Sequence, residues 1–176
     1  MRFLLMVVAG CLAQATMAGY RELPAEGNPL PGDYPASGVF IGAGVGLDHG
    51  GIGLRMDILA SERIGIFAGG GYNLATVGWN AGLLYRHPVK WLARPYITGM
   101  YGYNLAIKWQ IPGGGGTGTN YYGPSFGGGL EFWSAARTSF WHTALLVPVR
   151  SSEADEDLRW ASPKPWPVLF SFGYHF

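Results

Sequence analysis

Ionisable and hydroxyl side chains recur at alternate positions within segments that are otherwise apolar or aromatic. The alternation places the following residues on the face opposite the apolar one: Arg55, Asp57, Asn80, Thr98, Asn104, Lys108, Glu131, His142, Arg150, Ser171 and His175. Such a set can form ion pairs, line a polar channel, or supply a hydroxyl nucleophile with a neighbouring base. If the set is buried, its charges must be paired, because an unpaired buried charge costs several kcal/mol.

The elements that would position these residues are strands. Period-two alternation covers eight segments of about ten residues, a pattern typical of membrane-spanning strands. We predict strands at 38–47, 52–60, 64–72, 77–85, 96–109, 122–132, 141–149 and 168–176. On this pattern Leu47, Tyr103 and Leu105 lie on the apolar, outward face. The predicted fold class is all-β, an eight-stranded antiparallel up-and-down transmembrane β-barrel.

The connections fit a barrel with short turns at one end and long loops at the other. Asp48-His49-Gly50-Gly51 has the composition of a hairpin turn. The longest connections, 110–121 and 151–165, both fall on the outer side, where long loops are expected. The link from Arg86 to Pro95 is predicted as a periplasmic turn, although it is longer than most such turns.

Aromatic residues at the strand ends sort into two belts, which is where amphipathic rings meet lipid headgroups. The outer rim is expected to hold Tyr72, Trp109, Tyr121, Tyr122 and Trp166. The inner rim is expected to hold Tyr85, Phe132, Trp133, Phe140 and Trp141.

Residues 1–18 have the layout of a secretory signal peptide, with Arg2 followed by an apolar run and then small residues. Cleavage after Ala15 and after Ala18 both fit, and Ala18 is slightly favoured. The stretch Val8-Ala9-Gly10-Cys11 also resembles a lipobox, so lipidation of Cys11 stays an alternative.

Residues 19–36 are rich in proline, glycine and charge and are expected to form a flexible periplasmic leader, with the barrel at 37–176. Cys11 is the only cysteine, so a mature chain cut at either alanine has no disulfide and no thiolate metal site.

The composition excludes some classes of function. Charged residues make up 13% of the chain, against about 25% in ordinary soluble domains. Beyond the N-terminal segment there is no apolar run of about 18 residues, so contact with lipid would have to be made by strands. The net charge of +1 and the lack of Lys/Arg runs argue against nucleic acid as a partner. No cofactor is expected.

The last predicted strand is the most specific pattern in the chain. Phe170, Phe172, Tyr174 and Phe176 alternate with smaller or polar residues up to the final position. This strand resembles the C-terminal assembly signal of bacterial outer-membrane barrels. From residue 38 to 176 the chain resembles the small eight-stranded outer-membrane barrel superfamily, which includes the OmpA transmembrane domain, OmpX and opacity proteins. The resemblance implies the outer membrane of a Gram-negative bacterium, with membrane lipids, lipopolysaccharide and the barrel-assembly machinery as partners.

Three functions remain open for a barrel of this kind. Because an eight-stranded interior is filled by side chains, we expect a polar plug in which Arg55 and Lys108 pair with Asp57 and Glu131. The protein would then have a structural or surface-interaction role and conduct ions poorly. The alternatives are a narrow gated pore and a lipid-modifying enzyme. The enzyme would depart from the lipid A deacylases, because Thr143 and Ala144 follow His142 where that family has His-x-Ser-Asn.

The two long loops carry further motifs. The tetraglycine at 113–116 lacks the Lys-Ser/Thr ending of a phosphate-binding loop and is interpreted as a mobile surface loop. Glu153, Asp155, Glu156 and Asp157 form an acidic run that is interpreted as solvated, with Ca²⁺ or Mg²⁺ binding as the alternative.

Overall fold

The structure, a computed structural model, describes residues 34–35, 37–89, 93–110, 116–159 and 165–176. The side chains at 108–110 and 116–117 lie outside this description. No helix in these ranges is long and apolar enough to cross a membrane.

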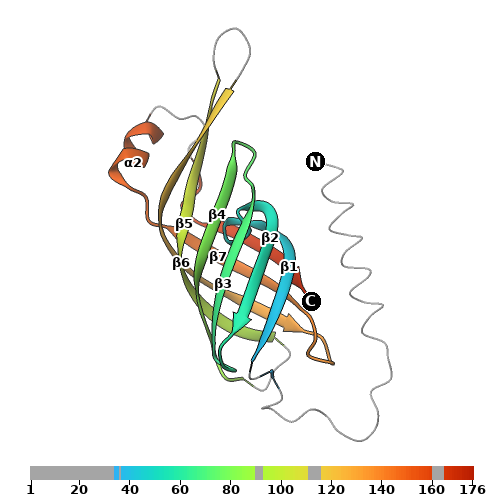
Figure 1. Cartoon of the computed structure of the whole chain (residues 1–176). Coiled ribbons are helices and arrows are strands. Elements are labelled where there is room, and N and C mark those ends of the chain that lie inside the picture. Colours follow the sequence, from blue (N-terminus) through green and yellow to red (C-terminus); the bar gives the residue numbers. More distant parts are fainter. Residues whose placement is uncertain (1–33, 36, 90–92, 111–115, 160–164) are drawn as a thin grey trace, which may run out of the picture.

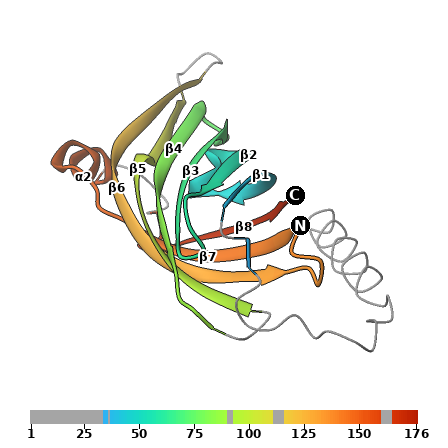
Figure 2. The same cartoon turned by 60° about the horizontal axis from the view of Figure 1, so that its bottom comes forward.

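Eight antiparallel strands pair in sequence order and close into one barrel (Figures 1 and 2). The strands are β1 (Gly38–Gly46), β2 (Gly51–Leu59), β3 (Ile64–Tyr72), β4 (Val77–Arg86), β5 (Ala93–Gln110), β6 (Gly116–Trp133), β7 (Phe140–Pro148) and β8 (Leu169–His175). Two short helices, η1 (Leu47–His49) and α2 (Ser152–Leu158), lie in the connections. The predicted fold class is confirmed, and most strand limits agree with the sequence pattern to within a few residues.

The C-terminal residue closes the barrel. Phe176 and Ile41 exchange two backbone hydrogen bonds, each 3.0 Å long, and β8 pairs with β1 from His175 to Phe172. Because the sheet has no open edge, the backbone groups of the wall are satisfied by neighbouring strands, as a strand structure in lipid requires.

The apolar face of the wall points outward. Val39, Leu54 and Ile97 are 60%, 61% and 64% exposed, and their neighbours along each strand point inward. The exposed set includes residues from all eight strands, for example Ile66, Val77, Trp79, Leu83, Phe126, Leu145 and Phe170. A soluble barrel has the opposite arrangement, with its apolar side chains inside.

The first connection, between β1 and β2, folds into the barrel. Leu47, Asp48 and His49 make one turn of 3-10 helix, η1, and all three side chains are buried. Gly50 ends the turn in the left-handed region at φ 73°, which glycine adopts without strain. The hairpin predicted at 48–51 is present, because β1 and β2 pair antiparallel on either side of it. The connection folds into the barrel, however, and the predicted outward placement of Leu47 is wrong.

Glycines on the inner wall make the space that η1 occupies. A side chain on Gly69 would collide with the Asp48 carbonyl oxygen, and one on Gly53 or Gly71 would collide with that of His49. The backbone of η1 therefore lies directly against β2 and β3 without intervening side chains.

A register shift between Tyr103 and Leu105 in the β5–β6 pairing changes which residues of β5 face outward. A bulge of this kind breaks the two-residue alternation locally. Tyr103 is only 7% exposed and packs with Leu47 and Phe67 inside the barrel, so its predicted outward placement is wrong. Leu105 is equally buried, but it is covered by Ala154 and Leu158 of α2.

Beyond the shift, β5 and β6 continue as a long hairpin that rises above the other strands, with α2 beside it (Figure 1). The segment 151–165 was predicted to be a loop, but Ser151 caps α2 by accepting a hydrogen bond from the Ala154 N–H. Leu105, Ala154 and Leu158 pack together, and the Tyr121 hydroxyl donates to Asp157. The hairpin and α2 thus form one packed unit.

An aromatic cluster fills the opposite end of the barrel. Tyr34, Phe40, Leu59, Trp133 and Phe140 are buried against one another, with several rings packed edge to face. Trp133 and Phe140 therefore point inward, and their predicted place in the inner lipid-facing belt is wrong. Tyr34 lies within the segment 19–36 that was expected to form a flexible leader. In the structure its side chain is buried in this cluster.

Candidate functional site

Asp48 is the centre of a buried polar network inside the barrel. Its carboxylate accepts hydrogen bonds from Arg55 Nη1 and Ser171 Oγ. His49 Nδ1 and His142 Nε2 each lie 3.0 Å from its oxygens. The helical turn η1 places Asp48 beside its partners on β2, β7 and β8. This one connection therefore contacts strands from both the early and the late part of the sequence.

Arg55 links Asp48 to a second carboxylate. Its Nη2 donates to Asp57 Oδ1 at 2.6 Å, and its guanidinium lies 4.1 Å from the centre of the Phe67 ring. His175 Nδ1 lies 2.9 Å from the other Asp57 oxygen. The predicted pairing of Arg55 with Asp57 is present, and the structure adds Asp48 to it.

A second ion pair lies nearer the aromatic end. Arg86 Nε donates to Glu131 at 2.8 Å, and Trp133 Nε1 donates to the same carboxylate at 3.0 Å. Arg94 is also buried and donates to the Glu62 carbonyl oxygen at 2.7 Å. Both arginines lie on strands, so the prediction of a turn from Arg86 to Pro95 is wrong at both of its ends.

The neutral polar residues of the predicted interior set bind the backbone. Asn80 donates to the Leu47 and Tyr103 carbonyl oxygens at 2.7 and 3.1 Å and so holds η1 against the wall. Thr98 and Asn104 likewise donate to main-chain carbonyl oxygens at 2.9 and 2.7 Å. These side chains thus direct their polar groups at main-chain oxygens and not at other side chains.

Two members of the predicted set lie apart from the network. The Lys108 side chain is outside the described residues, so its predicted pairing stays a prediction. Arg150 lies past the end of β7 and donates to the Trp166 carbonyl oxygen at 2.9 Å. It borders a pocket of about 280 Å³ whose lining includes Leu47, Tyr103 and Leu169. Arg150 thus lines the mouth of the barrel above η1.

Ser171, which shares the Asp48 carboxylate with two histidines, is not arranged as a nucleophile. Ser171 Oγ donates to the Asp48 carboxylate and lies 3.3 Å from the Val45 carbonyl oxygen. Activation of a serine requires its proton to go to a base that a third group orients. Asp48 already accepts a hydrogen bond from Arg55, which makes its carboxylate a weak base.

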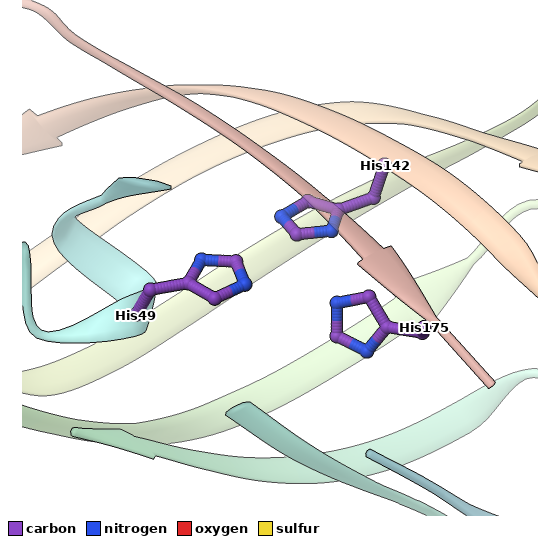
Figure 3. A group of neighbouring side chains, drawn as sticks. All are labelled: His49, His142 and His175. Carbon is purple, nitrogen blue, oxygen red and sulfur yellow. The ribbon is translucent and has the colours of Figure 1, made fainter. Parts of the chain in front are cut away.

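Three buried histidines meet beside η1. Figure 3 shows the rings of His49, His142 and His175 turned toward one another. One nitrogen of each ring lies within 4.8 Å of the nitrogens of the other two. Sequence alternation places His142 and His175 inside. It does not place His49 and Asp48 there, because the composition of 48–51 assigns both residues to a hairpin turn.

The fold is similar to that of a known bacterial barrel domain. One solved structure, the N-terminal β-barrel domain of Pseudomonas aeruginosa OprF, matches 80% of this chain and 98% of its own length. The TM-score is 0.51 and the sequence identity is 15%. The chain has the fold of this small eight-stranded barrel. The expected resemblance to OmpA-type barrels is thereby confirmed at the level of fold. No protein-family model and no curated protein sequence matches the chain.

Proposed function

We propose that the protein is an integral outer-membrane barrel with a closed lumen, which has a structural or surface-contact role in the envelope. The observation that carries the proposal is the inversion of the barrel: aliphatic and aromatic side chains cover the outside, while Arg55, Arg86 and Glu131 are buried inside. Outward apolar surface of this extent is stable in lipid and costs free energy in water.

The connections support an orientation in the membrane. The β2–β3 and β6–β7 connections are short, whereas α2 and the extended β5–β6 hairpin lie at the other end. Since outer-membrane barrels have short periplasmic turns and long outer loops, the hairpin and α2 would face the cell exterior. Their packing through Leu105 and Leu158 makes them a defined contact surface.

The network also supports a closed lumen. η1 and the side chains of Arg55, His142 and His175 are almost fully buried inside the barrel. A water-filled path would have to displace η1 and break the Asp48 ion pair, which is unfavourable in a low-dielectric interior. A structural role is therefore favoured over a gated pore, and the hydrogen bonding of Ser171 favours it over a lipid-modifying enzyme.

The experiment is expression in a Gram-negative host with a detectable tag in the 113–115 loop. We expect the protein in the outer-membrane fraction, with gel mobility that changes on heating and a tag that reaches antibody on intact cells. Recovery from the soluble periplasmic fraction without heat-modifiable mobility would overturn the proposal.

A further inference from the structure

We propose that His49, His142 and His175 form a binding site for one divalent transition-metal ion, with Zn²⁺ as the best fit, inside the barrel. The inference goes beyond the proposed envelope role. It concerns a cluster that comes from three parts of the chain, η1, β7 and β8, and that the ion pairs of the lumen do not explain.

The nitrogens that face one another are free to bind an ion. His49 Nε2, His142 Nδ1 and His175 Nε2 are buried and have no hydrogen-bond partner. Figure 3 shows a nitrogen of each ring directed into the space between the three. A buried polar atom without a partner costs about 1–3 kcal/mol. An ion bound between the three rings would give all three nitrogens a partner.

The second nitrogen of each ring faces a carboxylate. His49 Nδ1 and His142 Nε2 each lie 3.0 Å from Asp48, and His175 Nδ1 lies 2.9 Å from Asp57. Metal-binding histidines almost always direct their other nitrogen at a carboxylate or carbonyl, which fixes the tautomer and raises the basicity of the binding nitrogen. His49 and His142 have this arrangement, and His175 Nδ1 lies at ion-pair distance from Asp57 without forming a hydrogen bond to it.

The charge of the cluster favours a cation. Two carboxylates, Asp48 and Asp57, share the single guanidinium of Arg55, so with neutral imidazoles the cluster carries one uncompensated negative charge. The next pair, Arg86 with Glu131, balances itself. A divalent ion between the rings would offset the excess negative charge in an interior where charge is costly.

The distances allow binding after a small adjustment. The three nitrogens lie within 4.8 Å of one another, so an ion centred between them lies at most about 2.8 Å from each, against about 2.0–2.1 Å for a Zn–N bond. Each ring would therefore move inward by at most about 0.7 Å. His49 and His142 are stacked with 8° between their planes, so one ring must also turn to direct its lone pair at the ion.

The donor set selects the class of metal. Imidazole nitrogens suit Zn²⁺, Cu²⁺ and Ni²⁺, whereas Ca²⁺ and Mg²⁺ take oxygen ligands. Three protein ligands leave a fourth tetrahedral position for water or another small ligand. A bound ion would join η1 to β7 and β8 and so hold the inward-folded turn in place.

The test uses folded, full-length mature protein without a histidine tag, stripped with chelator in detergent. Zn²⁺, Co²⁺ and Ca²⁺ are titrated by calorimetry, and bound Co²⁺ is followed by its visible spectrum. We expect one Zn²⁺ or Co²⁺ per chain, a tetrahedral Co²⁺ spectrum and no Ca²⁺ binding. Failure of the wild type to bind Zn²⁺ would overturn the proposal.

Variants locate the ion. The chain has four histidines, and the fourth, His87, is exposed, which makes His87→Gln the matched control. His49→Gln and His142→Gln should each weaken Zn²⁺ binding by more than about 100-fold, since loss of an outer-shell group alone costs 10–100-fold. His87→Gln should bind as the wild type does. Unchanged affinity in folded His49→Gln and His142→Gln would place the ion elsewhere and refute the site.

A measurement on the wild type covers the case in which these variants do not fold. X-ray absorption at the zinc edge of the Zn²⁺-loaded protein should show three imidazole ligands. A coordination shell of oxygen ligands only would refute the site.

Discussion

At the scale of single residues, the barrel interior depends on charge compensation. Arg55 is the only cation that contacts both Asp48 and Asp57 among the described residues. Replacing a buried pair by apolar groups can be neutral, but removing one partner leaves the others buried and unpaired. Substitution of a charged residue in the lumen is therefore expected to cost much more stability than substitution of a charged residue on the surface.

Replacing Arg55 with methionine should lower the free energy of unfolding by about 3–5 kcal/mol, because two buried carboxylates lose their counter-ion. The control is Arg63→Met on the exposed β2–β3 turn, which should stay within about 0.5 kcal/mol of the wild type. The measurement is reversible urea unfolding in lipid vesicles. Equal stability of the two variants would show that the network adds little to the fold.

The two-residue alternation predicts which side chains face the lumen but not how those side chains pair. Alternation alone places Asp57, Asn80, Glu131 and His142 inside. The alternation does not predict the ion-pair partner of each residue, however, because the partner depends on which strands face each other across the lumen. Glu131 pairs with Arg86, which the sequence pattern assigned to a turn.

At the scale of elements, strands were predictable and the departures from them were not. Outward Val, Ile and Leu residues recur every second position, so strand limits and faces follow from period two. The residues from Asp48 to Gly51 predict a hairpin turn, but their composition does not indicate whether the turn faces solvent or folds inward. Only the facing glycines at 53, 69 and 71 show where the turn goes, and their proximity is a property of the closed barrel.

Two adjacent glycines on β3 test the packing of η1. A methyl group on Gly69 would collide with the Asp48 carbonyl oxygen, whereas one on Gly70 would meet nothing nearer than 3.7 Å. Gly69→Ala should therefore destabilise the barrel by about 1–3 kcal/mol through overpacking. Gly70→Ala should be neutral or slightly stabilising, because glycine weakens a strand. Thermal unfolding in detergent compares the two, and a Gly70→Ala variant as unstable as Gly69→Ala would contradict the inward position of η1.

The last strand is tested by deleting Phe176. Its backbone makes two hydrogen bonds to Ile41 at the barrel seam, and unsatisfied groups there would each cost several kcal/mol in lipid. We expect a lower yield of heat-modifiable barrel for the deletion, and near-normal yield for a matched deletion of Gly113, which lies between β5 and β6 in the sequence. Equal yields would show that neither seam closure nor a C-terminal assembly signal depends on Phe176.

At the scale of the whole molecule, the barrel is apolar on its outside and filled on its inside. The aromatic cluster of Tyr34, Trp133 and Phe140 fills one end, and η1 with the Asp48 network fills the middle. An eight-stranded barrel is just wide enough for side chains to fill its interior. Here a main-chain turn enters the interior as well, so closure does not depend on any one side chain.

Ion conductance across a planar bilayer tests whether the lumen is closed. Mature protein is inserted from vesicles in which heat-modifiable mobility shows that the barrel has folded, and a general porin serves as the positive control. We expect wild-type protein to show no sustained conductance, because a path for ions would require η1 to leave the lumen and the Asp48 ion pair to break. Sustained conductance of the size seen with the porin would contradict the account.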